Sequence, residues 1–255
     1  MPVKDATQRF SSRVDNYVRY RPGYPLEILE LLKKECGLAP ESVIADIASG
    51  TGIFTRMLLE NGNCVFGVEP NAKMRRAGER FLENHAGFTS VAGTAEATTL
   101  PDHSVDFVTA AQAAHWFDRE KARREFIRIL KPEGCWAVLL WNERRTDSTP
   151  FLRDYEHLLL TYGTDYQEVR HERTTAEIAG FFAPSPFRSC GLEMRQEVDY
   201  AGLEGRLLSS SYVPTSNHAN YEPMLRELQR IYKAHQVSDR VRLEYNTLVY
   251  CGQLE

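Results

Sequence analysis

Basic residues are not in excess in this sequence. Its 255 residues include 31 lysines and arginines against 35 aspartates and glutamates, which leaves a formal net charge of −4. Proteins that bind nucleic acid through its phosphates need a basic surface, and this composition gives no electrostatic reason to expect one. We therefore expect no nucleic-acid partner.

Long apolar runs and paired cysteines are also absent from the sequence. No stretch approaches the ~18 apolar residues of a membrane-spanning helix, and the start, Met-Pro-Val-Lys-Asp, lacks the apolar segment of a signal peptide. The five cysteines are an odd number without a Cys-x-x-Cys pair, which favours neither a disulfide framework nor a zinc site. We expect a cytoplasmic protein with free thiols, no membrane partner and no metal.

Short apolar segments alternate with helix-length segments in the first half of the chain. A helix is predicted at 26–37. Strands are predicted at 42–47, 64–69, 88–91, 105–111 and 135–141, with helices between them at 52–61, at 70–84 and after a cap at Asp118. This alternation is typical of a parallel sheet covered by helices on both faces. Ligands of such sheets bind beyond the carboxyl ends of the strands, where we expect the functional site.

The alternation weakens after residue 142. Residues 142–189 are rich in aromatic and charged side chains and read as a helical insertion that covers the sheet. Strands are predicted at 192–199 and 241–251, and a helix with an apolar stripe at 221–235. Because the last strands are expected to close the same sheet, we expect one domain.

The segment Asp46-Ile47-Ala48-Ser49-Gly50-Thr51-Gly52 joins the first predicted strand to a helix. Glycine lets the backbone approach a ligand closely, and a helix N-terminus is electropositive. The dinucleotide fingerprint GxGxxG lacks its third glycine here, and the phosphate loop GxxxxGK[ST] lacks its lysine. Because Asp46 would repel a pyrophosphate, the loop favours a ligand with a positive charge.

Two further acids follow later strands. Glu69 ends the second predicted strand, where its carboxylate could accept hydrogen bonds from both hydroxyls of a ribose. The segment Gly93-Thr94-Ala95-Glu96 follows the third strand, where the adenine ring of the same ligand would lie. The implied ligand carries a nucleoside and a positive end but no phosphate chain.

These elements together resemble those of the class I S-adenosylmethionine-dependent methyltransferases, in the type 11 group that includes trans-aconitate-methyltransferase-like enzymes. Residues 46–52 resemble the first motif, DxGxGxG, with Ala48 in place of its first glycine, and residues 130–134 resemble the turn before the fifth strand. The added methyl of Ala48 removes glycine's freedom of φ, but alanine is small enough that we expect cofactor binding to survive.

The resemblance implies the rest of the fold and the cofactor. It implies a Rossmann-like, doubly wound, mostly parallel seven-stranded sheet, S-adenosylmethionine as cofactor and S-adenosylhomocysteine as product. The expected layout of the single domain is an N-terminal helical arm at 1–40, a cofactor-binding core at 41–142, a cover at 143–221 inserted after the fifth strand, and a closing helix and strand at 222–255. The implied cofactor site consists of Tyr17, Arg21, Asp46, Ala48, Ser49, Gly50, Gly52, Glu69, Pro70, Ala95, Glu96, Ala111 and Gln112.

The N-terminal segment at 17–25 resembles a further family element, YxxxRPxYP, which folds over the cofactor. An aromatic face such as that of Tyr17 can meet a sulfonium, and the Arg21 guanidinium can pair with the methionine carboxylate. The alternative is an arm that only packs on the core.

Methyl transfer from a sulfonium is an in-line displacement, so the protein positions the acceptor and, where needed, removes its proton. His115 follows the fourth predicted strand and is the candidate general base, because the ordinary histidine pKa near ~6.5 suits proton abstraction. The alternative is a histidine that only bonds across the rim. Its neighbour Trp116 is a candidate pocket wall or a core residue.

Three other side chains are candidates for the acceptor site. Trp141 and Arg144 follow the fifth predicted strand, where an arginine could clamp a carboxylate or simply lie in solvent. Tyr212 could supply a hydroxyl or mark a packed helix end.

We expect a methyltransferase acting on a carboxylate or hydroxyl oxygen of a small molecule. The alternatives are a protein or nucleic-acid methyltransferase, disfavoured by the net charge and the missing [ND]PP[YF] element, and a non-catalytic S-adenosylmethionine-binding module.

Overall fold

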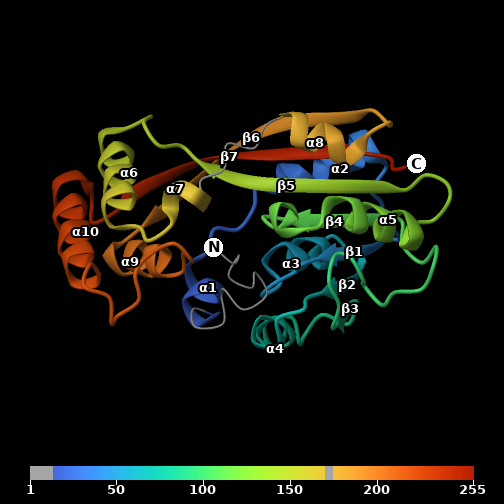
Figure 1. The fold of residues 1–255 in the computed structure, drawn as a ribbon, viewed down its shortest axis with the longest axis horizontal. Helices are drawn as coiled ribbons and strands as arrows, with labels where there is room; N and C mark the ends of the chain where they lie inside the picture. Colours follow the sequence, from blue (N-terminus) through green and yellow to red (C-terminus); the bar gives the residue numbers. More distant parts are fainter. Residues whose placement is uncertain (1–13, 170–174) are drawn as a thin grey trace.

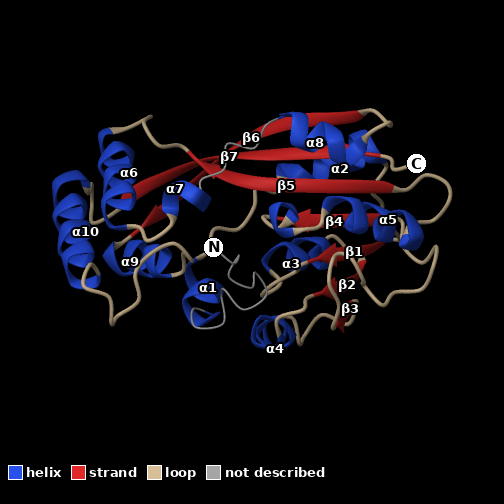
Figure 2. Cartoon of the chain, viewed as in Figure 1, coloured by secondary structure: helices blue, strands red, loops and turns tan. Residues whose placement is uncertain are grey.

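Seven strands form one mixed sheet in the order β3-β2-β1-β4-β5-β7-β6 (Figures 1 and 2). The computed structural model describes residues 14–169 and 175–255. The strands are β1 (Val43–Ile47), β2 (Cys64–Val68), β3 (Phe88–Val91), β4 (Phe107–Ala111), β5 (Trp136–Arg144), β6 (Phe187–Val198) and β7 (Val241–Gly252). The first five strands are parallel to one another, and β7 is antiparallel to both β5 and β6.

The chain reverses its direction of travel across the sheet between β1 and β4. It runs outward from β1 through β2 to β3, then crosses back to pair β4 with the other side of β1, with Asp46 opposite both Gly67 and Thr109. Four of the five residues of β1 are buried, as expected for a parallel strand covered on both faces. The loops after β1 and β4 therefore diverge around one crevice at the carboxyl edge.

Helices cover both faces of the sheet. Those of the sheet region are α2 (Glu27–Cys36), α3 (Ile53–Glu60), α4 (Ala72–Phe81), α5 (Arg119–Ile129) and α8 (Thr175–Phe182). On one face, Leu32 of α2 and Leu58 of α3 pack against Ile44 and Val65 of the sheet. On the other face, Phe126 of α5 and Phe182 of α8 pack against the sheet. Asn71 and Asp118 cap the starts of α4 and α5 with their side chains, so both predicted helix starts are confirmed.

The strands β6 and β7 are long and extend past the others into a second apolar core. Figure 1 shows them continuing to the left, where α6 (Pro150–Tyr162), α9 (Tyr200–Leu208) and α10 (Tyr221–His235) surround them, with α7 (Tyr166–Val169) beside α6. Leu158, Leu207, Leu228 and Leu243 are all buried in this core. The covering helices are therefore held by a core of their own.

The N-terminal helix α1 (Val14–Tyr20) lies between this second core and the sheet region. It packs on α9 at Gly205, where a β-carbon would lie 2.2 Å from Tyr20 Cδ2. The absence of a side chain at Gly205 lets the two helices approach closely. The Nη2 of Arg21, just after α1, donates to the carbonyl of Ser209 at the end of α9 (3.0 Å), which fixes the arm to the cover.

The predicted fold class is confirmed, and several boundaries need correction. β5 continues to Arg144 instead of stopping at Trp141, because its outer end pairs with β7, with Arg144 opposite Tyr245. β6 begins at Phe187, earlier than predicted, since this edge strand is mostly polar and pairs only with β7. The helix α9 was not predicted. No helix in the described ranges is both long and apolar enough to cross a membrane.

Candidate functional site

A cavity of about 420 Å³ opens where the strand order reverses. Its volume lies in the range of small-molecule sites, ~300–1,000 Å³. One wall is the loop after β1, a second is the segment after β4, and the arm and the cover close the remaining sides. The lining residues that the following paragraphs use are Tyr17, Arg21, Tyr24, Asp46, Ala48, Ser49, Gly50, Thr51, Ala111, Gln112, His115, Trp116, Glu143, Arg144, Tyr166, Arg206, Tyr212 and Tyr245.

Asp46 is a buried carboxylate at the inner wall of the cavity. Its side chain is 1% exposed, and its two oxygens accept hydrogen bonds from the hydroxyls of Thr55 (2.6 Å) and Thr109 (2.9 Å). Burial raises the pKa of Asp46 to about 6, and the two hydroxyl bonds only partly oppose this rise. A cationic ligand beside it would stabilise the ionised form, so this wall suits a positive charge.

The backbone of the loop after β1 has left-handed residues at three positions. Ala48, Gly50 and Gly52 have φ values of 53°, 60° and 84°. Glycine adopts this region freely, whereas alanine does so at a cost of roughly 1–2 kcal/mol. Ala48 therefore sits strained at the position where the family motif has glycine. Thr51 Oγ1 is buried at the cavity with no hydrogen-bond partner among the described residues.

Glu69 lies behind this loop and holds it in place. Its carboxylate accepts the backbone N–H of Gly50 (3.0 Å) and of Asn71 (2.7 Å), and burial raises its pKa. Glu69 is 6% exposed and does not line the cavity in this structure. Its predicted contact with a ribose stays a prediction, although Glu69 lies next to the loop that lines the cavity.

Four other predicted cofactor residues also lie outside the cavity wall: Gly52, Pro70, Ala95 and Glu96. Gly52 is the N-cap of α3, where a β-carbon would lie 2.6 Å from Leu82 Cδ1. Ala95 is buried, and Glu96 accepts the backbone N–H of Asp118 (2.9 Å) just before α5. Their roles on the adenine side stay predictions.

The N-terminal arm forms one side of the cavity. The Arg21 guanidinium lies over the Tyr17 ring, 4.8 Å from its centre, and both side chains line the space. Tyr24 also lines it and packs edge-on against Phe54, with the ring centres 5.1 Å apart. Tyr24 is a cavity residue outside the predicted set.

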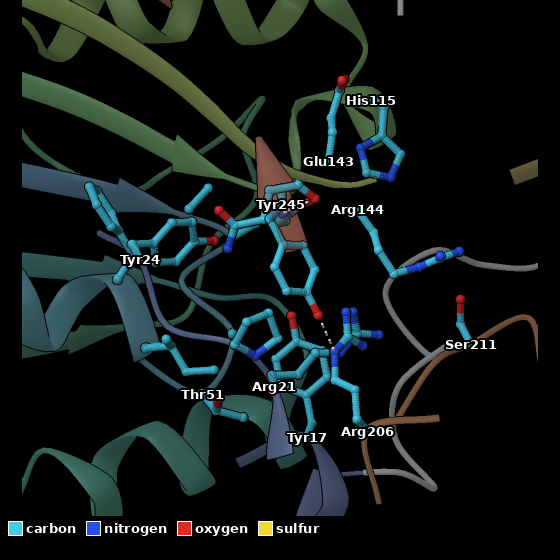
Figure 3. A pocket seen from close by; sticks show the side chains of 18 of the residues that line it. Tyr17, Arg21, Tyr24, Thr51, His115, Glu143, Arg144, Arg206, Ser211 and Tyr245 are labelled. Carbon is cyan, nitrogen blue, oxygen red and sulfur yellow. Dashed lines mark hydrogen bonds between the residues drawn. The ribbon is translucent and has the colours of Figure 1, made fainter. Parts of the chain in front are cut away.

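The segment after β4 supplies the opposite side. Ala111 and Gln112 line the cavity, and Gln112 has a φ of 60° and donates through Nε2 to the Asn142 carbonyl (3.2 Å). His115 and Trp116 follow in a short 3₁₀ helix, with ring centres 4.6 Å apart, and both line the cavity. Figure 3 shows the His115 ring beside Glu143 at one end of the view.

The cover contributes a basic and aromatic wall. Arg144, Arg206, Tyr166, Tyr212 and Tyr245 all line the cavity. Burial alone would raise the pKa of Tyr212, but Arg206, Arg21 and Arg144 outweigh burial and lower it. The lowered pKa shows that the charge of three guanidiniums is felt at this phenol. The cavity therefore has an acidic inner wall and a basic outer wall.

Trp141 does not belong to the cavity, contrary to its expected place at the rim. Its side chain is 1% exposed and packs edge-on against Tyr250 in the apolar core of the sheet, with ring centres 5.8 Å apart. Because β5 continues past Trp141, this residue lies inside the strand instead of after it, and its side chain faces the core.

Arg206, Tyr166 and Tyr245 are cavity residues that the sequence did not reveal. Arg206 lies in α9, a helix without a strong apolar stripe in the sequence. Tyr245 lies in the strand predicted at 241–251, and nothing in the pattern of that strand points to a cavity. These residues reach the cavity because β6 and β7 are long. A local sequence pattern does not predict the length of these paired strands.

The described residues fit the cofactor that the motif implies. A carboxylate and an unpartnered hydroxyl, those of Asp46 and Thr51, lie on the inner wall, and the Arg21 guanidinium lies on the arm. This set complements a molecule that carries a positive centre and a carboxylate. The β-carbon direction at Gly50 meets only Met74 Cε at 3.5 Å and the Ala48 carbonyl at 3.9 Å, so no atom crowds this part of the loop.

Comparisons with known proteins agree with this geometry. A family profile described as a methyltransferase domain matches residues 45–138. An uncharacterised methyltransferase-like protein of Schizosaccharomyces pombe is 28% identical over 250 residues, 96% of this chain and 95% of that protein. An uncharacterised methyltransferase of Mycobacterium tuberculosis is 34% identical over 174 residues, 68% of this chain and 67% of that protein.

A solved structure from Anaeromyxobacter dehalogenans, named as a type II methyltransferase, has the same fold. It superposes with a TM-score of 0.68 at 25% identity and covers 92% of this chain and 98% of that chain. The finer likeness to trans-aconitate-methyltransferase-like enzymes stays a prediction. The chain belongs to the class I S-adenosylmethionine-dependent methyltransferases, and S-adenosylmethionine is its cofactor.

Proposed function

We propose that this methyltransferase modifies a small-molecule acceptor at an oxygen of a carboxylate or a hydroxyl. The observation that carries the proposal is the cavity of about 420 Å³, which the arm and the cover close on the side away from the sheet. A space of this size accepts a small molecule better than a polypeptide or a nucleic-acid strand. The basic side of its wall favours an acceptor with negative charge.

The described residues divide into two groups in this proposal. Asp46, Thr51 and Arg21 would hold the cofactor, the first beside its positive end and the last beside its carboxylate. When bound, S-adenosylmethionine supplies the methyl group as an electrophile. The remaining walls orient the acceptor and exclude water, with Trp116 as an apolar surface.

His115 is the proposed general base for a hydroxyl acceptor. It lines the cavity on the segment after β4, opposite the arm and the basic wall. An imidazole nitrogen there can take the hydroxyl proton as the oxygen is methylated. A carboxylate acceptor has no proton to lose, so His115 would then only orient it. The His115→Ala variant should lower kcat for a hydroxyl acceptor and leave cofactor affinity unchanged.

The test is to incubate the protein with methyl-labelled S-adenosylmethionine and fractionated cell metabolites, small acids included. The proposal predicts label in a low-molecular-weight ester or ether. Base treatment separates the two outcomes, because methyl esters are hydrolysed and methyl ethers are not. Label that appears only in protein or nucleic acid, or on nitrogen or carbon of a small molecule, would overturn the proposal.

We also propose that the chain acts as one domain in the cytoplasm, without nucleic-acid or membrane partners. Support for one domain comes from the sheet, which continues through both apolar cores. Support for a reducing compartment comes from the five cysteines, all of which are free thiols.

A further inference from the structure

Arg206 carries a buried guanidinium that has no acidic partner in the described part of the chain. Arg206 is 9% exposed. Its guanidinium forms no ion pair with residues 14–169 or 175–255. Its two hydrogen bonds go to neutral oxygens and are long. Nε donates to the Tyr245 hydroxyl (3.4 Å; Figure 3), and Nη1 donates to Ser210 Oγ (3.5 Å). The charge is therefore held in place but is not neutralised.

Removing a charge from water costs several kcal/mol. Burial alone would lower the pKa of Arg206, and the phenols of Tyr245, Tyr212 and Tyr155 outweigh burial and raise it, but a phenol is not a counter-ion. Arg144, on the same wall, shows the usual solution: its guanidinium pairs with the buried Glu156 carboxylate at 2.5 Å. The contrast between the two arginines indicates that the negative partner of Arg206 is not among the described residues. Because Arg206 lines the cavity, a bound ligand can supply that partner.

A second guanidinium lies beside Arg206. Burial and the neighbouring Arg206 lower the pKa of Arg21, so the two like charges are close enough to repel. The Nε of Arg21 is buried and has no hydrogen-bond partner in the described part of the chain. Aromatic faces support both groups, Tyr17 under Arg21 at 4.8 Å and Tyr245 under Arg206 at 6.0 Å. These faces orient the two guanidiniums. Because Arg21 is the residue proposed for the cofactor's carboxylate, Arg206 is left for a second anion.

We propose that Arg206 binds an anionic group of the methyl acceptor, a carboxylate or a phosphate. This inference rests on the proposed function and names the acceptor's chemical class. Arg206 belongs to the cover, whereas the motif loops that resemble cofactor-binding elements lie on the sheet. The planar guanidinium of an arginine can donate two hydrogen bonds at once to two oxygens of such a group.

The anionic group that Arg206 binds anchors the acceptor and does not contain the oxygen that is methylated. An oxygen that accepts hydrogen bonds from a guanidinium holds its lone pairs in those bonds and is a weaker nucleophile. The reacting oxygen therefore lies elsewhere on the acceptor, towards the His115 side of the cavity. The acceptor class is a small molecule with one anionic group and a second, separate carboxylate or hydroxyl.

The test uses protein saturated with S-adenosylhomocysteine and three probes: succinate, inorganic phosphate and the neutral succinamide. Melting temperature is measured against probe concentration for the wild type, for Arg206→Gln and for the exposed control Arg195→Gln. We expect the anions, but not succinamide, to stabilise the wild type and the control. Arg206→Gln should lose ~10- to 100-fold in apparent anion affinity, as expected for lost charge-assisted hydrogen bonds.

Two further readouts separate a binding role from a structural one. Without probe, Arg206→Gln should still unfold in a single cooperative transition, which shows that the variant is folded. Its affinity for S-adenosylhomocysteine should stay within about twofold of wild type. If glutamine prevents folding, Arg206→Lys keeps the charge and should retain part of the anion response.

Four results would overturn the inference: no response of the wild type to either anion, an equal response to succinamide, an unchanged response in Arg206→Gln, or a parallel loss of S-adenosylhomocysteine affinity. The last would assign Arg206 to the cofactor carboxylate. These measurements need no methyl transfer, so their outcome does not depend on whether a labelled ester or ether is found.

Discussion

The ring of Tyr20 packs directly on the backbone of Gly205, so closely that a β-carbon at Gly205 would lie 2.2 Å from Tyr20 Cδ2 and 2.3 Å from Cε2. This contact fixes α1 to α9. Because Tyr17 and Arg21 flank Tyr20 and Arg206 follows Gly205, the same contact brings the arm and the cover together around the cavity.

Gly205→Ala should separate α1 from α9 and weaken ligand binding. The added methyl must displace the Tyr20 ring or the helix, at ~1–3 kcal/mol, whereas alanine stabilises α9 itself by ~1 kcal/mol. We expect a nearly unchanged melting temperature but ~5- to 100-fold weaker binding of S-adenosylhomocysteine by calorimetry. Gly23→Ala on the same arm is the control, since its β-carbon meets nothing within 4 Å. Wild-type affinity in Gly205→Ala would show that arm docking does not matter.

Asp46→Asn should stabilise the unliganded protein at neutral pH. Burial raises the pKa of Asp46 from its ordinary 3.8 to about 6. The folded state thus binds more protons than the unfolded state between these values, and wild-type stability falls as pH rises from below 4 to above 6. A shift of about two units corresponds to ~3 kcal/mol, and asparagine, which does not titrate, avoids this loss. Both hydroxyls of Thr55 and Thr109 can still bond to the amide.

Urea unfolding at several pH values checks this prediction. Asp46→Asn should exceed the wild type by up to ~3 kcal/mol at pH 7 and match it near pH 4, and it should lose most cofactor affinity. The exposed Asp147→Asn serves as control. A variant that is less stable than wild type at pH 7 would show that Asp46 is held ionised by the fold itself.

Ala48→Gly should relieve backbone strain. Ala48 has a φ of 53°, where a β-carbon is unfavourable, and glycine should stabilise the fold by ~1 kcal/mol. In a protein of this size that corresponds to a rise of roughly 2–4 °C in melting temperature. Ala72→Gly, at the exposed start of α4, should change stability in the opposite direction. A lower melting temperature for Ala48→Gly would contradict the assigned backbone conformation.

Glu156→Gln should strongly destabilise the cover. Glu156 is 7% exposed and accepts hydrogen bonds from Arg144 (2.5 Å) and from the Tyr166 hydroxyl (2.8 Å). Loss of its charge leaves Arg144 buried without a counter-ion, at ~3–5 kcal/mol. The double variant Arg144→Met/Glu156→Leu should recover most of this loss in denaturant unfolding. A single variant within about 0.5 kcal/mol of wild type would mean that the pair is not formed.

The sequence predicted the sheet region well because its signals are local. Buried parallel strands such as β1 are short apolar runs, and helix starts such as those at Asn71 and Asp118 depend on a side chain a few residues away. The loop from Asp46 to Gly52 was recognisable because its glycine spacing follows from backbone conformation.

The acceptor side of the cavity could not be predicted in the same way. Arg206 reaches the cavity only because α9 packs on α1 and on the extended ends of β6 and β7, contacts between residues far apart in the chain. Trp141 was misplaced for a related reason: the length of β5 is set by its pairing with β7, which joins residues about a hundred positions apart. A local sequence pattern does not predict which distant strands will pair.

The central claim is that the cavity between Asp46 and the arm is the S-adenosylmethionine site. The most direct test is a crystal structure of the protein with S-adenosylhomocysteine. We expect the ligand beside the loop after β1, with its ribose hydroxyls at Glu69 and its carboxylate at Arg21. A ligand bound elsewhere on the molecule, with this cavity left to solvent, would contradict it.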